Sequence, residues 1–242
     1  MGYQSIGRRR VDSTVVTQHD VLKSHECDKI RDQVLDLRKY WKQRSDMGRF
    51  FTLGAAAYLD AVGRRDAYLQ EARDYNQILR SNFDWLWERI RMGFEESLAA
   101  PVSLDPQCAL PGFHIFIFEG EDQTGDRPSS RAHFDLQWFH AQPGSRPEET
   151  LSFTLLVEEP LGGSSLEIWP VHHDAIGTGF DTRKYAASRP SQTLQYARGR
   201  MIVHDGLLLH AIGRASIATP KGYRITFQGH GAKISGTWRL YW

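Results

Sequence analysis

The chain has 242 residues, of which 40% are hydrophobic and 12% aromatic. This length can bury the core of one domain or at most two, and we expect one. The 30 Lys and Arg residues against 29 Asp and Glu leave a formal net charge of +1. A balanced charge offers no broad basic surface, so we expect a small-molecule partner and no nucleic acid.

Targeting features are sparse in this sequence. No apolar run reaches the roughly 18 residues of a membrane span, and the first ten residues lack the hydrophobic segment of a secretory signal. Cys27 and Cys108 are too few for a disulfide framework and lack metal-type spacing. We therefore expect a cytoplasmic protein without membrane contact, and Arg8 to Arg10 as a solvated tail; the oligomeric state is not indicated.

The N-terminal part is predicted to be helical. An apolar stripe at spacings of three and four predicts a helix of about Glu26 to Arg44 capped by Ser24, and consists of Cys27, Ile30, Val34, Leu37 and Trp41. A longer helical pattern runs from about Asp66 to Leu98, with a break near Ser81 and Pro101 closing it. The intervening "GRFFTLGAAAYLDAVG" is rich in small residues, which favours a close-packed turn or loop over a long regular element.

After Pro111 the sequence changes to short β-type runs separated by turn residues. These runs are "FHIFIFEG", "AHFDLQWFH", "LSFTLLVEE", "SSLEIWP", "TLQYA", "GRMIVHDG" and "YRITFQGHG". Their spacing leaves no room for a helix between most of them, which favours an antiparallel sandwich or jelly roll. The prediction is one mainly β (α+β) domain over 1–242, in which a helical part, about 1–105, braces one outer face of a core of about 106–242.

The stretch "RAHFDLQW" places polar residues at alternate positions of a predicted strand. His133, Asp135 and Gln137 would share one face, opposite three apolar side chains. Because a carboxylate is seldom buried without a partner, the His133–Asp135 pair is either solvated at a sheet edge, salt-linked internally, or bound to a cation.

His210 can complete a cation site with that pair. It follows Asp135 by 75 residues, in "VHDGLLLHAIG", and 14 residues later Arg224 and Thr226 share one face of another strand. Two histidines and a carboxylate on one face of an octahedron suit non-haem Fe(II), whereas a structural zinc site takes four ligands, usually including cysteine. An inward guanidinium can pair bidentately with a carboxylate.

This ordered set of residues resembles the Fe(II)- and 2-oxoglutarate-dependent dioxygenase superfamily over roughly residues 111–231. The resemblance implies a double-stranded β-helix, a cupin-like jelly roll, with N-terminal helices packed on it. It also implies that His133, Asp135 and His210 are the iron ligands. Arg224, helped by the Thr226 hydroxyl, would bind the far carboxylate of 2-oxoglutarate. "GGSSLEIW" is similar to the family's Gly-rich turn and strand between the ligands.

The implied reaction consumes O2 and 2-oxoglutarate, releases succinate and CO2, and hydroxylates a C–H bond of a small molecule. An amino acid, an amino-acid derivative or a specialised metabolite is expected, which would place the enzyme in biosynthesis. Asp135 disfavours halogenation, because related halogenases have Gly or Ala there. Desaturation, cyclisation or epimerisation with the same cofactors stay open. A non-catalytic jelly-roll binding module is the alternative of another class, but it gives no reason for a buried Arg224; a cupin metal enzyme would show His-x-His.

The remaining histidines have weaker patterns. His204 lies inside a strand and is the rival of His210. His114 could contact cosubstrate or substrate, or be a hydrogen-bonded core residue. Gln137 is a candidate for orienting a ligand or contacting substrate. His230 is interpreted as structural or exposed.

Some other residues are interpreted as local structure. His172 and His173 are expected in a turn, and Trp138 and Trp169 are expected to pack in the core. The substrate pocket would be bordered by loops, including "TLGAAAYLD" and a flexible lid in "GEDQTGDRPSSR".

Overall fold

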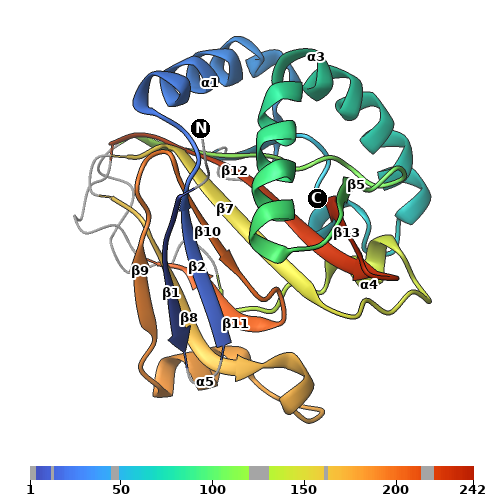
Figure 1. Ribbon diagram of the computed structural model, residues 1–242, viewed down its shortest axis with the longest axis vertical. Helices are drawn as coiled ribbons and strands as arrows, with labels where there is room; N and C mark the ends of the chain where they lie inside the picture. Colours follow the sequence, from blue (N-terminus) through green and yellow to red (C-terminus); the bar gives the residue numbers. More distant parts are fainter. Residues whose placement is uncertain (1–3, 12–13, 45–48, 120–130, 161–162, 214–220) are drawn as a thin grey trace.

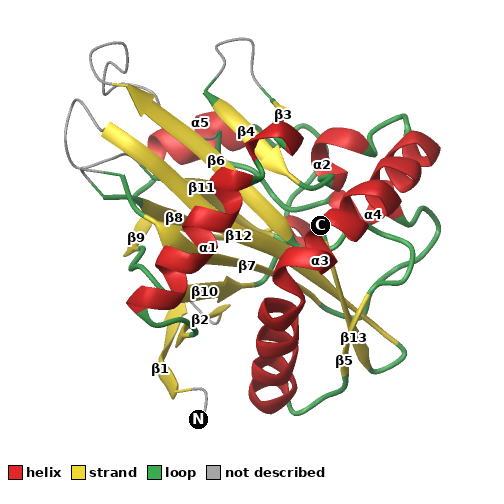
Figure 2. Cartoon of the chain, turned by 90° about the horizontal axis from the view of Figure 1, so that it is seen from above, coloured by secondary structure: helices red, strands yellow, loops and turns green. Residues whose placement is uncertain are grey.

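Two β-sheets and a layer of helices make up the protein in the computed structural model, which describes residues 4–11, 14–44, 49–119, 131–160, 163–213 and 221–242. The sheets face each other, and the long helices cover the outer face of the larger one (Figures 1 and 2). The predicted mainly β jelly roll braced by N-terminal helices is therefore confirmed.

The larger sheet is antiparallel along its main path. In spatial order it contains β1 (Gln4–Val11), β2 (Thr14–Asp20), β10 (Arg200–His204), β7 (Thr150–Glu158), β12 (Lys221–Ile234), β6 (Gly112–Glu119), β4 (Phe50–Leu53) and β3 (Lys42–Gln43). At its side, β13 (Thr237–Tyr241) pairs with β12, and β5 (Val102–Leu104) pairs with β13 in parallel.

The smaller sheet contains three strands in the order β11 (Leu208–Ile212), β8 (Ser165–His172), β9 (Gln192–Gln195). An apolar cluster joins it to the larger sheet: Leu156 and Ile202 come from the larger sheet, Ile168 and Leu194 from the smaller. This cluster lies at one part of the interior. A second part of the same interior is lined by polar residues, among them His133, Asp135 and His210.

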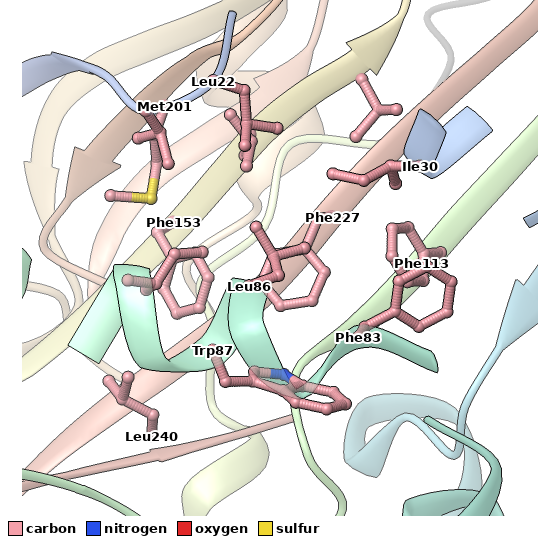
Figure 3. Close-up of a cluster of buried hydrophobic side chains, with 14 of the residues drawn as sticks. Leu22, Ile30, Phe83, Leu86, Trp87, Phe113, Phe153, Met201, Phe227 and Leu240 are labelled. Carbon is pink, nitrogen blue, oxygen red and sulfur yellow. The ribbon is translucent and has the colours of Figure 1, made fainter. Parts of the chain in front are cut away.

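The main core lies between the larger sheet and the helices α1 (Ser24–Asp36) and α3 (Arg65–Leu98). Strand alternation explains the division. On β12, Phe227 faces α3 and packs near Trp87 (Figure 3). By alternation along the strand, Arg224 and Thr226 face the interior between the sheets. One strand therefore carries core residues on one face and candidate site residues on the other.

The first helix is shorter than predicted. α1 ends at Asp36, and a 3-10 turn at Arg38–Tyr40 and strand β3 follow, so the predicted extension to Arg44 is wrong. Trp41 is extended and its Nε1 donates to the Val34 carbonyl at 3.0 Å. Its apolar spacing thus reflects packing after the helix has ended. The cap is Lys23, one residue before the predicted Ser24.

The second helix is close to its prediction. α3 runs from Arg65 to Leu98, and its backbone is non-helical at Phe83, two residues beyond the predicted break. Ala99 follows in the left-handed conformation, before Pro101. The Phe83 side chain is fully buried and packs on Phe113 at a ring-centroid distance of 4.7 Å, so the kink occurs where the helix meets strand β6.

Several elements were not predicted. The N-terminal β1–β2 hairpin joins the larger sheet, because β2 pairs with β10. The prediction of a solvated tail at Arg8 to Arg10 is therefore wrong for the backbone, which forms part of strand β1. The alanine-rich segment forms β4 and the short helix α2 (Ala57–Asp60). A further helix, α5 (Thr182–Ser188), precedes β9. Among the described helices, none combines the length and the apolar character needed to cross a membrane.

Candidate metal centre

The segment that carries His133 and Asp135 is not a strand. His133 forms one isolated bridge with His210, and Gln137 already begins the short helix α4 (Gln137–Ala141), so the predicted strand is wrong. Phe134 packs against His173, with ring centroids 5.3 Å apart. The alternation of polar and apolar residues therefore belongs to an extended connection and not to a paired strand.

Main-chain hydrogen bonds bring the three predicted ligands together. The His133 N–H donates to the His210 carbonyl at 2.9 Å, and the His210 N–H donates back at 3.0 Å. The Asp135 N–H donates to the Gly206 carbonyl at 2.8 Å, in the turn between β10 and β11. Potential ligand atoms of all three side chains lie within 4.8 Å of one another. No other such group was found among the described residues.

Both histidines of this group are held in one tautomer. Nδ1 of His133 donates to the Arg131 carbonyl at 2.7 Å, and Nδ1 of His210 donates to the Leu208 carbonyl at 2.8 Å. Because a neutral imidazole has one N–H, Nε2 of each ring keeps a free electron pair. These Nε2 atoms lie 3.7 Å and 3.4 Å from the two carboxylate oxygens of Asp135.

The neighbouring histidines favour the ionised form of Asp135. Burial works to raise the pKa of Asp135, but the influence of His210, His230 and His133 outweighs it and holds that pKa below its ordinary value. Burial lowers the pKa of His210, against the opposing effect of Asp135. One carboxylate and two imidazoles on one side of a cavity form a donor set that suits a divalent transition-metal ion.

A cavity of about 410 Å³ opens beside this group. Its wall includes the three candidate ligands and a set of aromatic side chains: Phe50, Tyr58, Phe116, Phe134 and Tyr196. The size falls in the range of small-molecule sites. The side chain of His133 is 45% exposed, whereas that of His210 is 8% exposed, so the cavity reaches solvent on the His133 side.

His114 lies in the wall of this cavity. Its Nε2 is 2.8 Å from the Tyr58 hydroxyl, and its Nδ1 has no hydrogen-bond partner within the described part of the chain. Burial holds the pKa of His114 well below its ordinary value, and burial raises that of Tyr58. The pair therefore offers the cavity uncharged polar groups among aromatic rings.

Arg224 is buried one layer behind the cavity wall. It is 2% exposed, and none of its guanidinium nitrogens has a hydrogen-bond partner among the described residues. The guanidinium carbon lies 5.6 Å from the Phe116 ring and 5.2 Å from the Tyr196 ring, and both rings line the cavity. Thr226 is fully buried two residues on, and its hydroxyl accepts from Gln228 Nε2 at 3.0 Å. A buried, unpaired cation is costly unless an anion is bound.

His230 and Ser152 also line the site, and neither was assigned to it from sequence. His230, predicted to be structural or exposed, is buried, and its ring nitrogens contact Gln137 and Ser152. Burial lowers the pKa of His230 to about 4. His204, the predicted rival of His210, lies beside it at a ring-centroid distance of 4.5 Å but outside the three-residue group.

The minor predictions have mixed outcomes. Trp138 and Trp169 are buried core residues, as predicted. His172 ends β8, and His173 begins a 3-10 turn, which partly matches the predicted turn. The predicted lid "GEDQTGDRPSSR" lies almost wholly outside the described residues.

Comparisons with solved structures identify the fold. An N-substituted L-amino acid dioxygenase from Burkholderia ambifaria AMMD is 16% identical, with a TM-score of 0.59 over 95% of this chain and 87% of that one. Its complex with alpha-KG gives 15% identity and a TM-score of 0.57, over 93% and 85% of the two chains. The non-heme alpha ketoglutarate dependent epimerase SnoN from nogalamycin biosynthesis is 14% identical, with a TM-score of 0.51 over 91% of this chain and 82% of that one.

No protein-family profile and no curated protein sequence matches this chain. The structural likeness nevertheless confirms the predicted resemblance at the level of the fold: the chain has the jelly-roll architecture of the Fe(II)- and 2-oxoglutarate-dependent oxygenases.

Proposed function

We propose that this chain is an Fe(II)- and 2-oxoglutarate-dependent oxygenase that oxidises a C–H bond of a small molecule, by hydroxylation. Residues 1–242 would form one such domain, with a helical part of about 1–105 and a jelly-roll core of about 106–242. His133, Asp135 and His210 would hold the iron, and Arg224 with Thr226 would bind the distal carboxylate of 2-oxoglutarate. Bound iron supplies activation of O2, coupled to decarboxylation of the 2-oxo acid.

The observation that carries this proposal is the half-open donor set next to Arg224, a buried cation without a hydrogen-bond partner in the described parts of the chain. Two imidazole Nε2 atoms and a carboxylate converge from one side, and the other side of the group is the cavity. That arrangement suits non-haem Fe(II), which needs open positions for cosubstrate and oxygen. A binding module with structural histidines would give no reason to leave the Arg224 guanidinium without a partner.

The cavity favours a small-molecule substrate. Its volume of about 410 Å³ falls in the range of small-molecule sites, and it would hold the cosubstrate together with the substrate. The aromatic wall would exclude water from the reacting centre, and the Tyr58–His114 pair would offer hydrogen bonds that orient the substrate.

The test of this function is spectroscopic. We expect anaerobic addition of Fe(II) and 2-oxoglutarate to the metal-free protein to give a weak visible charge-transfer band, because the 2-oxo acid must chelate the iron. His210→Ala and Asp135→Ala should each abolish that band. The matched control is His19→Gln, since His19 is a buried histidine of β2 that is not part of the three-residue group. An unchanged band in both ligand variants would refute the assignment.

The reaction itself is tested by product analysis. Succinate formation should depend on Fe(II), O2 and a substrate drawn from a panel of amino acids, their N-substituted derivatives and small aromatic metabolites. Mass spectrometry of the substrate then separates hydroxylation, a gain of one oxygen atom, from desaturation or cyclisation, a loss of two hydrogen atoms, and from epimerisation, which leaves the mass unchanged.

A further inference from the structure

A chain of three side chains ends on the carboxylate of Asp135. The Ser152 hydroxyl contacts Asp135 Oδ2 at 2.5 Å, and His230 Nδ1 contacts the same hydroxyl at 3.0 Å. Gln137 Nε2 contacts His230 Nε2 at 2.6 Å. Gln137 is 2% exposed, Ser152 is 4% exposed, and His230 is 9% exposed. Water therefore has little access to any member of the chain.

The strand register explains why these residues meet. Ser152 lies directly opposite His230 in the β7–β12 pair. Opposite residues of antiparallel strands share a face, with Cβ atoms about 5 Å apart. Asp135 is held above this face by its main-chain bond to Gly206, and Gln137 is held above it at the start of α4. Strands β7 and β12 and the segment that leads into α4 thus meet beside the carboxylate.

The direction of each hydrogen bond follows from the chemistry of the groups. An ionised carboxylate only accepts, so the Ser152 hydroxyl donates its single hydrogen to Asp135. That hydroxyl must then accept from His230, which places a hydrogen on Nδ1. A neutral imidazole with Nδ1–H accepts at Nε2, and the Gln137 amide N–H is there to donate. Each donor meets an acceptor along the whole chain.

We propose that Gln137, His230 and Ser152 act as positioning residues that fix the rotation of the Asp135 carboxylate and thereby preorganise the metal site. This inference rests on the proposed function, in which Asp135 is a metal ligand. Without the chain, the carboxylate could turn about its terminal bond and present its oxygens differently to the imidazoles of His133 and His210. Groups that orient metal ligands in this way typically change metal affinity by about 10- to 100-fold.

Glycine on both sides of His230 supports a tightly fixed ring. A Cβ atom at Gly229 would lie 2.5 Å from the Phe153 ring and 2.8 Å from Pro111, and one at Gly231 would lie 2.8 Å from Leu151. The β12 backbone at Gly229 and Gly231 therefore lies directly against neighbouring side chains. This close packing opposes a shift of the strand that would move His230 away from Ser152.

The first experiment measures equilibrium binding of Co2+ and Ni2+ to the metal-free protein, without 2-oxoglutarate or substrate. We expect Ser152→Ala and His230→Leu to weaken binding by about 10- to 100-fold. His230→Asn should bind nearly as tightly as the wild type, because the Asn amide nitrogen can replace Nδ1 as donor to Ser152. His19→Gln is the control for loss of a buried histidine, and near-ultraviolet circular dichroism checks that each variant is folded.

The second experiment observes the chain directly, without metal. Nitrogen-15 NMR of histidine-labelled protein should show His230 with its hydrogen on Nδ1, and Ser152→Ala should shift that signal. A hydrogen on Nε2 in the wild type would overturn the proposed direction. Equal metal affinity of the wild type and Ser152→Ala would overturn the positioning role alone, whereas a wild type that binds neither ion would overturn the proposed function together with this inference.

Discussion

Arg224 shows what one residue can contribute when its buried charge has no hydrogen-bond partner among the described residues. Its guanidinium is buried between Phe116 and Tyr196 and makes no hydrogen bond to the described residues. Burial disfavours the charged form and lowers the pKa of the group, although Tyr196 and Glu159 partly offset this effect. The residue therefore destabilises the ligand-free protein and stabilises its complex with an anion.

This trade-off predicts opposite effects of Arg224→Met on stability and binding. The metal-free protein should gain about 1–3 kcal/mol in its free energy of unfolding, because a buried unsatisfied group is removed. The thermal stabilisation by 2-oxoglutarate with Fe(II) should be lost. Denaturant unfolding and thermal shift assays measure the two quantities. A variant that is less stable and still responds to 2-oxoglutarate would contradict this role.

Individual residues were predictable where their chemistry is unusual for the position. A histidine and an aspartate two residues apart, a distant histidine, and an arginine in an apolar strand each lack a reason to be in a core. His230 was missed, although the alternation that places Arg224 and Thr226 on the inner face continues through Gln228 to His230. Ser152 carries no signal of its own, because its role depends on the register between β7 and β12.

Among the elements, α3 provides the largest part of the helical cover over the sheet. Its buried face includes Leu79, Phe83, Leu86, Trp87 and Phe94. Trp87 is 1% exposed, contacts the Phe227 ring at 6.4 Å between centroids, and donates from Nε1 to the Pro111 carbonyl at 3.0 Å. Phe227 and Arg224 lie on opposite faces of β12, so this helix supports the strand from behind.

Removal of the Trp87 side chain should destabilise the fold. Trp87→Ala is expected to lower the free energy of unfolding by about 3–5 kcal/mol, since it removes a large buried side chain and a buried hydrogen bond. Met92→Ala, on the same helix at 58% exposure, should change it by less than about 0.5 kcal/mol. Urea titrations of both variants measure the difference. Similar stabilities would show that α3 is not held by this face.

Elements with strong local periodicity were predicted best. The two amphipathic helices and most of the strands of the jelly roll follow from spacings within one segment. The prediction failed at residues 131–138, where one extended connection mimics a strand, and at the β1–β2 hairpin. In that hairpin, β2 pairs with β10 through residues about 180 positions apart. Such pairing depends on the rest of the sheet, which local patterns do not contain.

For the whole molecule, buried histidines should make the metal-free protein sensitive to acid. His114, His204, His210 and His230 all have pKa values lowered by burial. The unfolded chain, with histidine pKa values near 6.5, therefore binds protons that the folded chain excludes. Their full contribution to stability is present above about pH 6.5 and is lost as the pH falls from there toward the lower folded values.

The expected slope is measurable by denaturant unfolding of the metal-free protein between pH 5 and pH 8. Each such histidine adds about 1.4 kcal/mol of lost stability per pH unit below about 6.5. His204→Asn should reduce the slope by one proton, while its amide nitrogen can still donate to the Asp205 carbonyl that His204 Nδ1 contacts at 2.8 Å. Stability that does not vary over this interval would show that these imidazoles are protonated or hydrated in the folded state.

The reciprocal main-chain hydrogen bonds between His133 and His210 have a consequence for how such a site can change. They join the two positions through groups that every residue other than proline possesses, so the spacing of the donors is independent of what the donors are. Either imidazole can in principle be exchanged for a carboxylate or a thiolate without dismantling the frame. The same scaffold thereby provides a starting point for redesigning ion preference one side chain at a time.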